Sequence, residues 1–146
     1  MFTNILIPVD GSTTALSAVA KAAGLAKTFG SSVTVLYVID PYPFTGVGAD
    51  FAYGQSQYLT AASAEANAAL DAAKQALNEA GIDKVITKMG EGHAIHEGII
   101  RAAKEVAADL IVMGSHGRKG LEKLVLGSVT QRVLGVSDIP VLVVRE

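Results

Sequence analysis

The sequence predicts an α/β fold, a doubly wound open sheet of five mostly parallel strands with helices on both faces. Five short apolar runs have the length and the Val, Ile and Leu content of strands buried on both faces. Alanine-rich stretches with helical spacing separate them, and such alternation is typical of parallel sheets. With 146 residues, the chain is large enough for one core, so we expect a single domain over residues 1–146.

The N-terminal part of the chain predicts a strand, a helix and a second strand. Residues 5–9 (ILIPV) form the first strand and residues 33–39 the second. Between them we expect a helix that Ser12 caps and that runs to about Phe29, because Gly30 suits the left-handed position after a helix. Ser12 could instead be a phosphate ligand, although capping is the more common use of serine at such a position.

Residues 40–58 (DPYPFTGVGADFAYGQSQY) predict an irregular loop, because they contain two prolines and three glycines. The stretch also holds five of the eight aromatic residues in the chain. Burial of these rings over a sheet end or a subunit contact is the simpler interpretation, and a ring that walls a ligand base is the alternative.

The rest of the chain continues the alternation of helices and strands. The expected elements are a helix over 59–80 ended by Gly81, a strand over 85–89, a turn over 90–92, a helix over 93–106, a strand over 110–113, a helix over 129–136 with Ser128 at its N-cap, and a strand over 139–144.

The stretch from Ala108 to Thr130 carries the clearest chemical signal. Its strand ends at a glycine, and the pattern G-x2-G-x9-G-S then leads into a helix. Glycines let a backbone approach a ligand closely, and the free N–H groups at a helix start favour an anion. The pattern, formed by Gly114, Gly117, Gly127 and Ser128, therefore predicts a phosphate site.

Two better-known phosphate motifs are absent from the sequence, since neither G-x4-G-K-[ST] nor G-x-G-x-x-G occurs. Lys119 lies in the loop but not at the position that a P-loop lysine takes, and no catalytic carboxylate is evident beside the loop. Fast phosphoryl transfer is therefore poorly supported, and we predict no catalytic residue. In an open α/β sheet, the ligand crevice lies where the strand order reverses. The first and fourth strands both end in glycine turns, at residues 8–12 and at Gly114, and would frame one pocket if they were neighbours.

Composition excludes several other classes. A net charge of −2 provides no basic field for nucleic acid, and no apolar run approaches the roughly 18 residues of a membrane span. The N-terminal residues do not resemble a signal peptide, so we expect a cytoplasmic protein. His93 and His96 stand three apart without a third ligand at a recognisable spacing, so no metal site is expected.

With these motifs, the chain resembles the universal stress protein family, specifically its ATP-binding branch, over essentially its whole length. The matching segments are ILIPVDGS at 5–12, VLYVID at 35–40, IVMGSHGRKGLEKLVLGSV at 111–129 and PVLVV at 140–144. The resemblance implies the strand order 3-2-1-4-5, which makes the first and fourth strands neighbours. It also implies a nucleotide-dependent regulatory or stress-response module that binds ATP, with Mg²⁺ held through the phosphates.

The resemblance further implies which residues bind the nucleotide. Asp10 and the backbone of Pro8 and Val9 would meet the adenine and ribose, and the main chain of Val38 would touch the base. Gly114 and Gly117 would let the loop close over ribose and phosphates. The phosphates would be bound by Gly127, Ser128 and Val129, with Thr130 as a weaker addition.

Family members commonly dimerise through the last strand, so we expect a homodimer through Pro140–Val144. Five apolar residues on a free sheet edge invite such pairing, although Arg145 and Glu146 could instead guard the edge and leave a monomer.

Other functions stay open. One is slow ATP hydrolysis or autophosphorylation, for which the polar residues Ser115, His116 and Ser128 are the only support. We expect His116 to be a solvent-facing loop residue, although it could contact a phosphate when protonated. A second is a protein-interaction platform built on the aromatic loop at residues 42–58. A third is a sensor of AMP or a cyclic nucleotide, since the motif does not determine how many phosphates the ligand carries.

Overall fold

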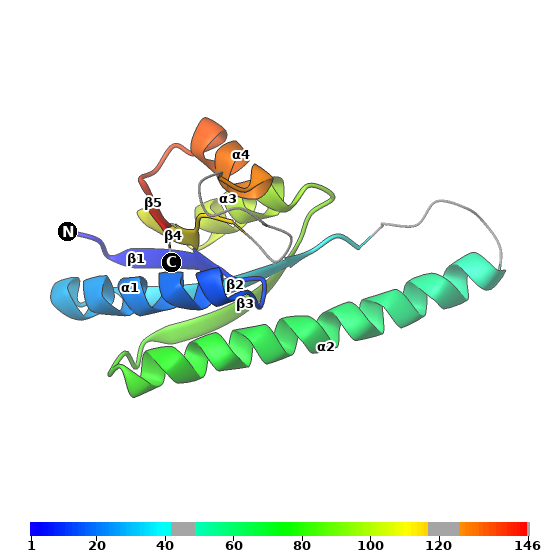
Figure 1. Cartoon of the computed structure of the whole chain (residues 1–146), viewed down its shortest axis with the longest axis horizontal. Coiled ribbons are helices and arrows are strands. Elements are labelled where there is room, and N and C mark those ends of the chain that lie inside the picture. The colour runs from blue at the N-terminus through cyan, green and yellow to red at the C-terminus, as the bar shows by residue number, and fades with distance from the viewer. Residues whose placement is uncertain (42–48, 117–125, 146) are drawn as a thin grey trace.

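The structure, a computed structural model, describes residues 1–41, 49–116 and 126–145. Five parallel strands form one sheet in the order β3-β2-β1-β4-β5, which confirms the predicted fold class and strand order (Figure 1). The strands are β1 (Asn4–Pro8), β2 (Ser32–Ile39), β3 (Val85–Glu91), β4 (Leu110–Gly114) and β5 (Val141–Val144). The helices are α1 (Thr13–Phe29), α2 (Ala49–Glu79), α3 (Ile95–Glu105) and α4 (Ser128–Val136).

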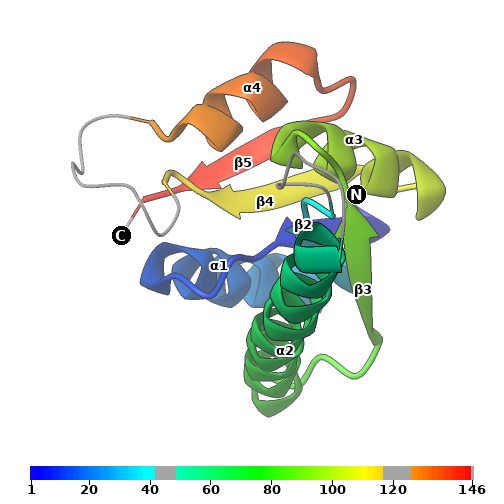
Figure 2. The same cartoon turned by 90° about the vertical axis from the view of Figure 1, so that its right-hand side faces the viewer.

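Helices cover both faces of the sheet, α1 and α2 on one face and α3 and α4 on the other (Figure 2). Because side chains alternate along a strand, β1 serves both layers. Ile5 and Ile7 pack into the core under α1 and α2, whereas Leu6 between them packs under α3 and α4. None of the described helices is both long and apolar enough to cross a membrane.

Helix α1 begins and ends where the sequence predicts. The Ser12 hydroxyl oxygen accepts a hydrogen bond from the Ala15 N–H at 3.1 Å, so Ser12 is the N-cap. Gly30 follows the helix at φ 66°, a left-handed conformation that glycine adopts without a steric cost.

The prediction of a loop over residues 40–58 is wrong for its second half, because α2 already begins at Ala49. A packed helix over the following residues is already nucleated, so extending it towards the N-terminus adds a hydrogen bond for each residue that is fixed. Gly54 lies inside this extension and costs only its weak helix propensity. Residues 42–48 of the predicted loop lie outside the described residues.

Smaller corrections concern the ends of elements. The predicted turn over 90–92 is wrong at Gly90 and Glu91, which extend β3 because they pair with the last residues of β2. Helix α3 starts at Ile95 and not at residue 93. β5 starts at Val141, since Pro140 has no N–H to donate, although its carbonyl still accepts from the Ile111 N–H at 3.0 Å.

Candidate functional site

A pocket of about 430 Å³ opens at the carboxyl ends of β1, β2 and β4. This is the edge of the sheet where the strand order reverses, because β1 lies between β2 and β4. The walls come from these three strands, from α3 and from the starts of α1 and α4. Segments that are distant in sequence therefore form one cavity of the size usual for small-molecule sites.

All of the predicted site residues except Gly117 line this pocket. They are Pro8, Val9, Asp10, Val38, Gly114, Gly127, Ser128, Val129 and Thr130. Gly117 lies outside the described residues. The sequence interpretation missed the lining residues Ser12, Ala15, Leu36, Tyr37, Ile95, Ile99, Met113 and His116 as part of the site. For Ser12 and His116 a phosphate contact was the less favoured alternative, and for Ile95 and Ile99 the four-residue spacing on one helix was the available signal.

One end of the pocket has an apolar floor. Leu36, Val38 and Met113 reach it from the strands, and Ile95 and Ile99 reach it from α3. Among these residues only Ile95 is more than 8% exposed. The floor can thus accommodate a flat apolar group such as a nucleobase.

The backbone of β2 is open to the pocket beside this floor. β1 ends opposite Leu36, and the Val9 N–H donates to the Leu36 carbonyl at 2.8 Å. The Ile39 carbonyl points the other way, since it accepts from the Gly92 N–H at 3.0 Å. Backbone groups of alternate residues face the same neighbouring strand. Val38 therefore directs its N–H and carbonyl to the side that β1 has already left, towards the pocket.

The start of α4 forms the opposite end of the pocket. Its first helical hydrogen bond runs from the Gln131 N–H to the Gly127 carbonyl at 3.0 Å. The N–H groups of Ser128, Val129 and Thr130 precede this bond and find no acceptor in the described part of the chain. These unpaired donors and the positive end of the helix dipole make this end suitable for an anion.

The predicted N-cap role of Ser128 is wrong. Gly127 occupies the N-cap position, at φ −63° and ψ 155°, and Ser128 is the first helical residue. The helix therefore has no side-chain cap, and the exposed Ser128 side chain lines the pocket.

The glycines at this end make room for other parts of the protein. A Cβ atom on Gly114 would lie 2.6 Å from Cγ2 of Thr14, and one on Gly127 would lie 3.0 Å from Cα of His116. The Thr130 hydroxyl donates to the Gly114 carbonyl at 2.9 Å and is buried. These contacts let α1, β4 and α4 pack closely around the pocket, so a larger residue at Gly127 would first collide with the protein.

His116 is not the solvent-facing residue that the sequence predicted. It lines the pocket half-buried, and its ring nitrogens lie 3.2 Å from the Thr14 hydroxyl and 3.1 Å from the Ser115 hydroxyl. Both hydroxyl residues are only 1% exposed. Ser115 does not line the pocket, so its hydroxyl supports the imidazole ring and does not face a ligand.

The turn after β1 fixes the position of Asp10. One carboxylate oxygen accepts from the Ser12 N–H at 2.9 Å, and Gly11 takes φ 84° between them. The carboxyl group is therefore held at the wall that joins the two ends of the pocket.

The fold and the pocket define a class, the doubly wound α/β proteins that bind a ligand at the switch point of a parallel sheet. The chain belongs to the universal stress protein family, whose family model matches residues 1–145.

Known relatives are similar to this chain in sequence or structure over nearly its whole length. A universal stress protein of Methanocaldococcus jannaschii, MJ0531, is 39% identical over 146 residues, which is all of this chain and 84% of the relative. The solved structure of universal stress protein UspA from Lactobacillus plantarum has a TM-score of 0.87 at 29% identity, covering 98% of this chain and 97% of that one. A universal stress protein in complex with cAMP has a TM-score of 0.74 at 26% identity, covering 99% and 97%.

Proposed function

We propose that this chain is an ATP-binding member of the family, which holds the nucleotide in the pocket and serves as a regulatory module in the stress response. One observation carries the proposal. A single cavity joins an apolar floor and an open strand edge at Val38 to the first N–H groups of α4, which have no acceptor among the described residues. These features suit a base and phosphates, respectively. The similar structure in complex with cAMP supports the nucleotide class.

Each part of the nucleotide has a counterpart in the pocket. The base would lie on the apolar floor, and its edge would exchange hydrogen bonds with the Val38 N–H and carbonyl. Asp10 would accept hydrogen bonds from the ribose hydroxyls. The phosphates would bind the N–H groups of Ser128, Val129 and Thr130 and the Ser128 hydroxyl. Mg²⁺ would be held through the phosphate oxygens, which it prefers as hard ligands.

The pocket is better suited to holding ATP than to hydrolysing it. Asp10 is the only carboxylate among the described lining residues, and one of its oxygens already accepts from the Ser12 N–H. Slow hydrolysis is the alternative, and a time course of ADP release would reveal it as turnover beyond one ADP per chain.

Ser128 offers a test that separates phosphate binding from folding. Ser128→Glu puts a negative charge at the helix start, which favours the helix dipole but repels phosphate. We expect ATP binding, measured by calorimetry, to weaken by about ten-fold or more. The melting temperature should not fall, because Ser128 is exposed.

Ser128→Gln is the matched control, since it has nearly the same shape without the charge. Both variants lose the Ser128 hydroxyl, but Ser128→Gln should bind ATP more tightly than Ser128→Glu because it carries no negative charge, and adenosine should bind all three proteins alike. Equal ATP affinity of the Glu and Gln variants would show that the phosphates do not bind at the start of α4. Tighter binding of AMP or cAMP than of ATP would make the protein a sensor of that nucleotide.

We also propose that the chain forms a homodimer through the outer edge of β5, predicted as Pro140–Val144. β5 is an edge strand, and Leu142 on it is 40% exposed. Leu142→Lys should convert the dimer to a monomer in analytical ultracentrifugation. Leu16→Lys, at a residue of α1 that is 45% exposed, should leave the dimer intact. A wild-type monomer at micromolar concentration would reject the dimer.

Two expectations stay predictions from the sequence, namely the cytoplasmic location and the docking of a partner protein on residues 42–58.

A further inference from the structure

The N-terminal half of α2 projects from the body of the molecule (Figure 1). From residue 52 onwards, the buried residues of this helix are Ala66, Leu70, Ala73 and Leu77, all in its second half. The first half is nevertheless tied to the body at the end of β2. We call these ties, from Tyr58 and Gln55, the α2 tether.

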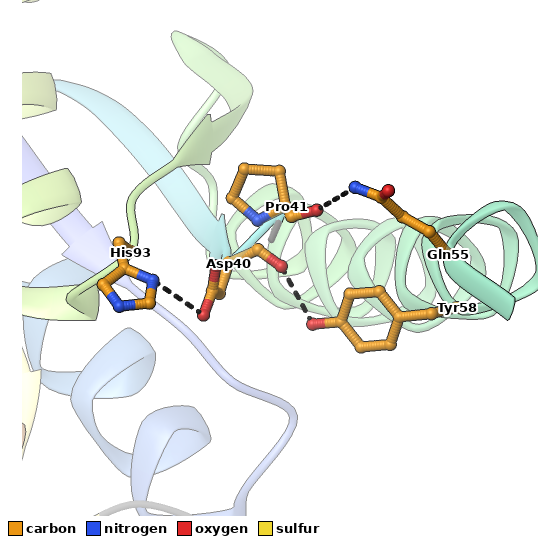
Figure 3. A network of polar contacts seen from close by, with 5 residues as sticks. All are labelled: Asp40, Pro41, Gln55, Tyr58 and His93. Carbon is orange, nitrogen blue, oxygen red and sulfur yellow. Dashed lines mark hydrogen bonds and ion pairs between the residues drawn. The ribbon is translucent and has the colours of Figure 1, made fainter. Parts of the chain in front are cut away.

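The α2 tether consists of two hydrogen bonds to consecutive carbonyl groups (Figure 3). The Tyr58 hydroxyl donates to the Asp40 carbonyl at 3.0 Å, and Gln55 Nε2 donates to the Pro41 carbonyl at 2.9 Å. Both donor residues are half-buried. The Asp40 carboxylate also lies 3.4 Å from Nδ1 of His93, just ahead of α3. The chain that leaves β2 is therefore held from two sides.

The end of β2 is also the base wall of the proposed nucleotide site. Val38 lies two residues before Asp40, and its backbone faces the side where β1 provides no further partner. A neighbouring cavity of about 370 Å³ is lined by Asp40 and Tyr58. It shares Tyr37, Val38 and Ile95 with the nucleotide pocket. The α2 tether thus lies directly behind the wall that the base would contact.

We propose that Tyr58 and Gln55 are positioning residues for the base, which fix the end of β2 so that the Val38 backbone is aligned before the nucleotide arrives. The inference rests on the proposed function. A wall held in place in advance avoids the entropy of ordering β2 on binding, and its release lowers affinity without removing any contact to the nucleotide. Helix α2 would then determine affinity at the base end, while α4 serves the phosphate end.

The arm of α2 also provides a matched control for the experiment. Gln57 Nε2 donates to the Tyr53 hydroxyl at 2.9 Å, and these two residues are exposed on the same arm. The tether variant combines Tyr58→Phe with Gln55→Met, and the control variant combines Tyr53→Phe with Gln57→Met. Both variants lose one phenol and one amide, but only the first removes the two hydrogen bonds to the carbonyl groups that follow β2.

We expect the tether variant to bind ATP roughly two- to ten-fold more weakly than the wild type, the range that corresponds to a net hydrogen bond. Adenosine, which lacks phosphates, should lose the same factor, and the control variant should bind both ligands like the wild type. Calorimetry gives the affinities, and circular dichroism checks that both variants retain the helix content of the wild type.

Three results would overturn the inference. Equal ATP affinity of the tether and control variants would show that the α2 tether does not align the base wall. A loss for ATP with none for adenosine would place the effect at the phosphate end. A wild-type chain that binds neither ligand would reject the proposed function and this inference with it, whereas the first two results leave the proposed function intact.

Discussion

At the residue scale, three hydroxyl side chains near helix starts have three different roles. Ser12 caps α1, and this was predictable because an Asp-Gly turn directly precedes it and a helical pattern follows. Ser128 is no cap, since its helix starts one residue earlier than the pattern indicates. Thr130 bonds the Gly114 carbonyl, a partner sixteen residues away that only the packing of α4 on β4 brings close.

Asp109 provides a residue-scale prediction at the end of the sheet away from the pocket. Its carboxylate accepts from the Thr3 N–H at 2.8 Å and from the Asn4 N–H at 3.0 Å. Desolvation by burial raises the pKa of this carboxyl, but the N–H donors of Thr3 and Asn4, together with smaller lowering effects, outweigh desolvation and hold the pKa below its ordinary value. Asp109→Asn should therefore lower the free energy of unfolding at pH 7 by about 1 kcal/mol.

The direction of the pKa shift determines how the stability contributed by Asp109 depends on pH. A lowered pKa in the folded state stabilises the protein above the unfolded-state pKa, and this stabilisation is lost as the pH falls through the folded-state value. The difference in the free energy of unfolding between wild type and Asp109→Asn, measured in urea, should thus narrow below about pH 4. Asp71→Asn, on the exposed face of α2, should show no gap. A gap for Asp109→Asn that stays constant down to pH 3 would contradict the assignment.

At the element scale, the sequence predicted the existence and order of the helices and strands better than their ends. The start of α2 was missed because prolines and glycines nearby favoured a loop, whereas the growth of a helix that is already nucleated decides the outcome. The end of β3 was missed because Gly90 and Glu91 form a turn signal by themselves, but pair with Val38 and Ile39 in the sheet. Both differences arise from neighbours that are distant in sequence.

Close packing of α3 on β2 gives an element-scale prediction. A Cβ atom on Gly98 would lie 2.6 Å from Cγ1 of Val38, the residue that lines the base end of the pocket. Gly98→Ala should destabilise the protein by about 1–3 kcal/mol, because the helix must move away from the strand. ATP binding should weaken as well, since Val38 is displaced.

Gly24 is the matched control, because it also lies within a helix and a Cβ atom there would have no neighbour within 4 Å. Gly24→Ala should stabilise the protein by up to about 1 kcal/mol through helix propensity alone. Thermal unfolding measures both variants. Equal melting temperatures for the two variants would mean that α3 does not pack closely against β2 at Gly98.

At the scale of the whole molecule, the pocket results from the strand order. β1 and β4 are neighbours, so the turn at Asp10 and the start of α4 face each other across one cavity. Alternating strands and helices predicted the layers, but the adjacency came only from the family resemblance. The apolar floor was not predictable as a unit, because Leu36, Met113 and Ile99 belong to three elements whose register no local pattern encodes.

The central claim is that this cavity binds an adenine nucleotide, and calorimetric titration of ATP into the wild-type chain, with and without Mg²⁺, tests it most directly. We predict saturable binding of one ATP per chain, with adenosine binding more weakly because it lacks the phosphates that α4 would hold. Absence of saturable binding of ATP, AMP and cAMP at millimolar concentration would contradict the claim.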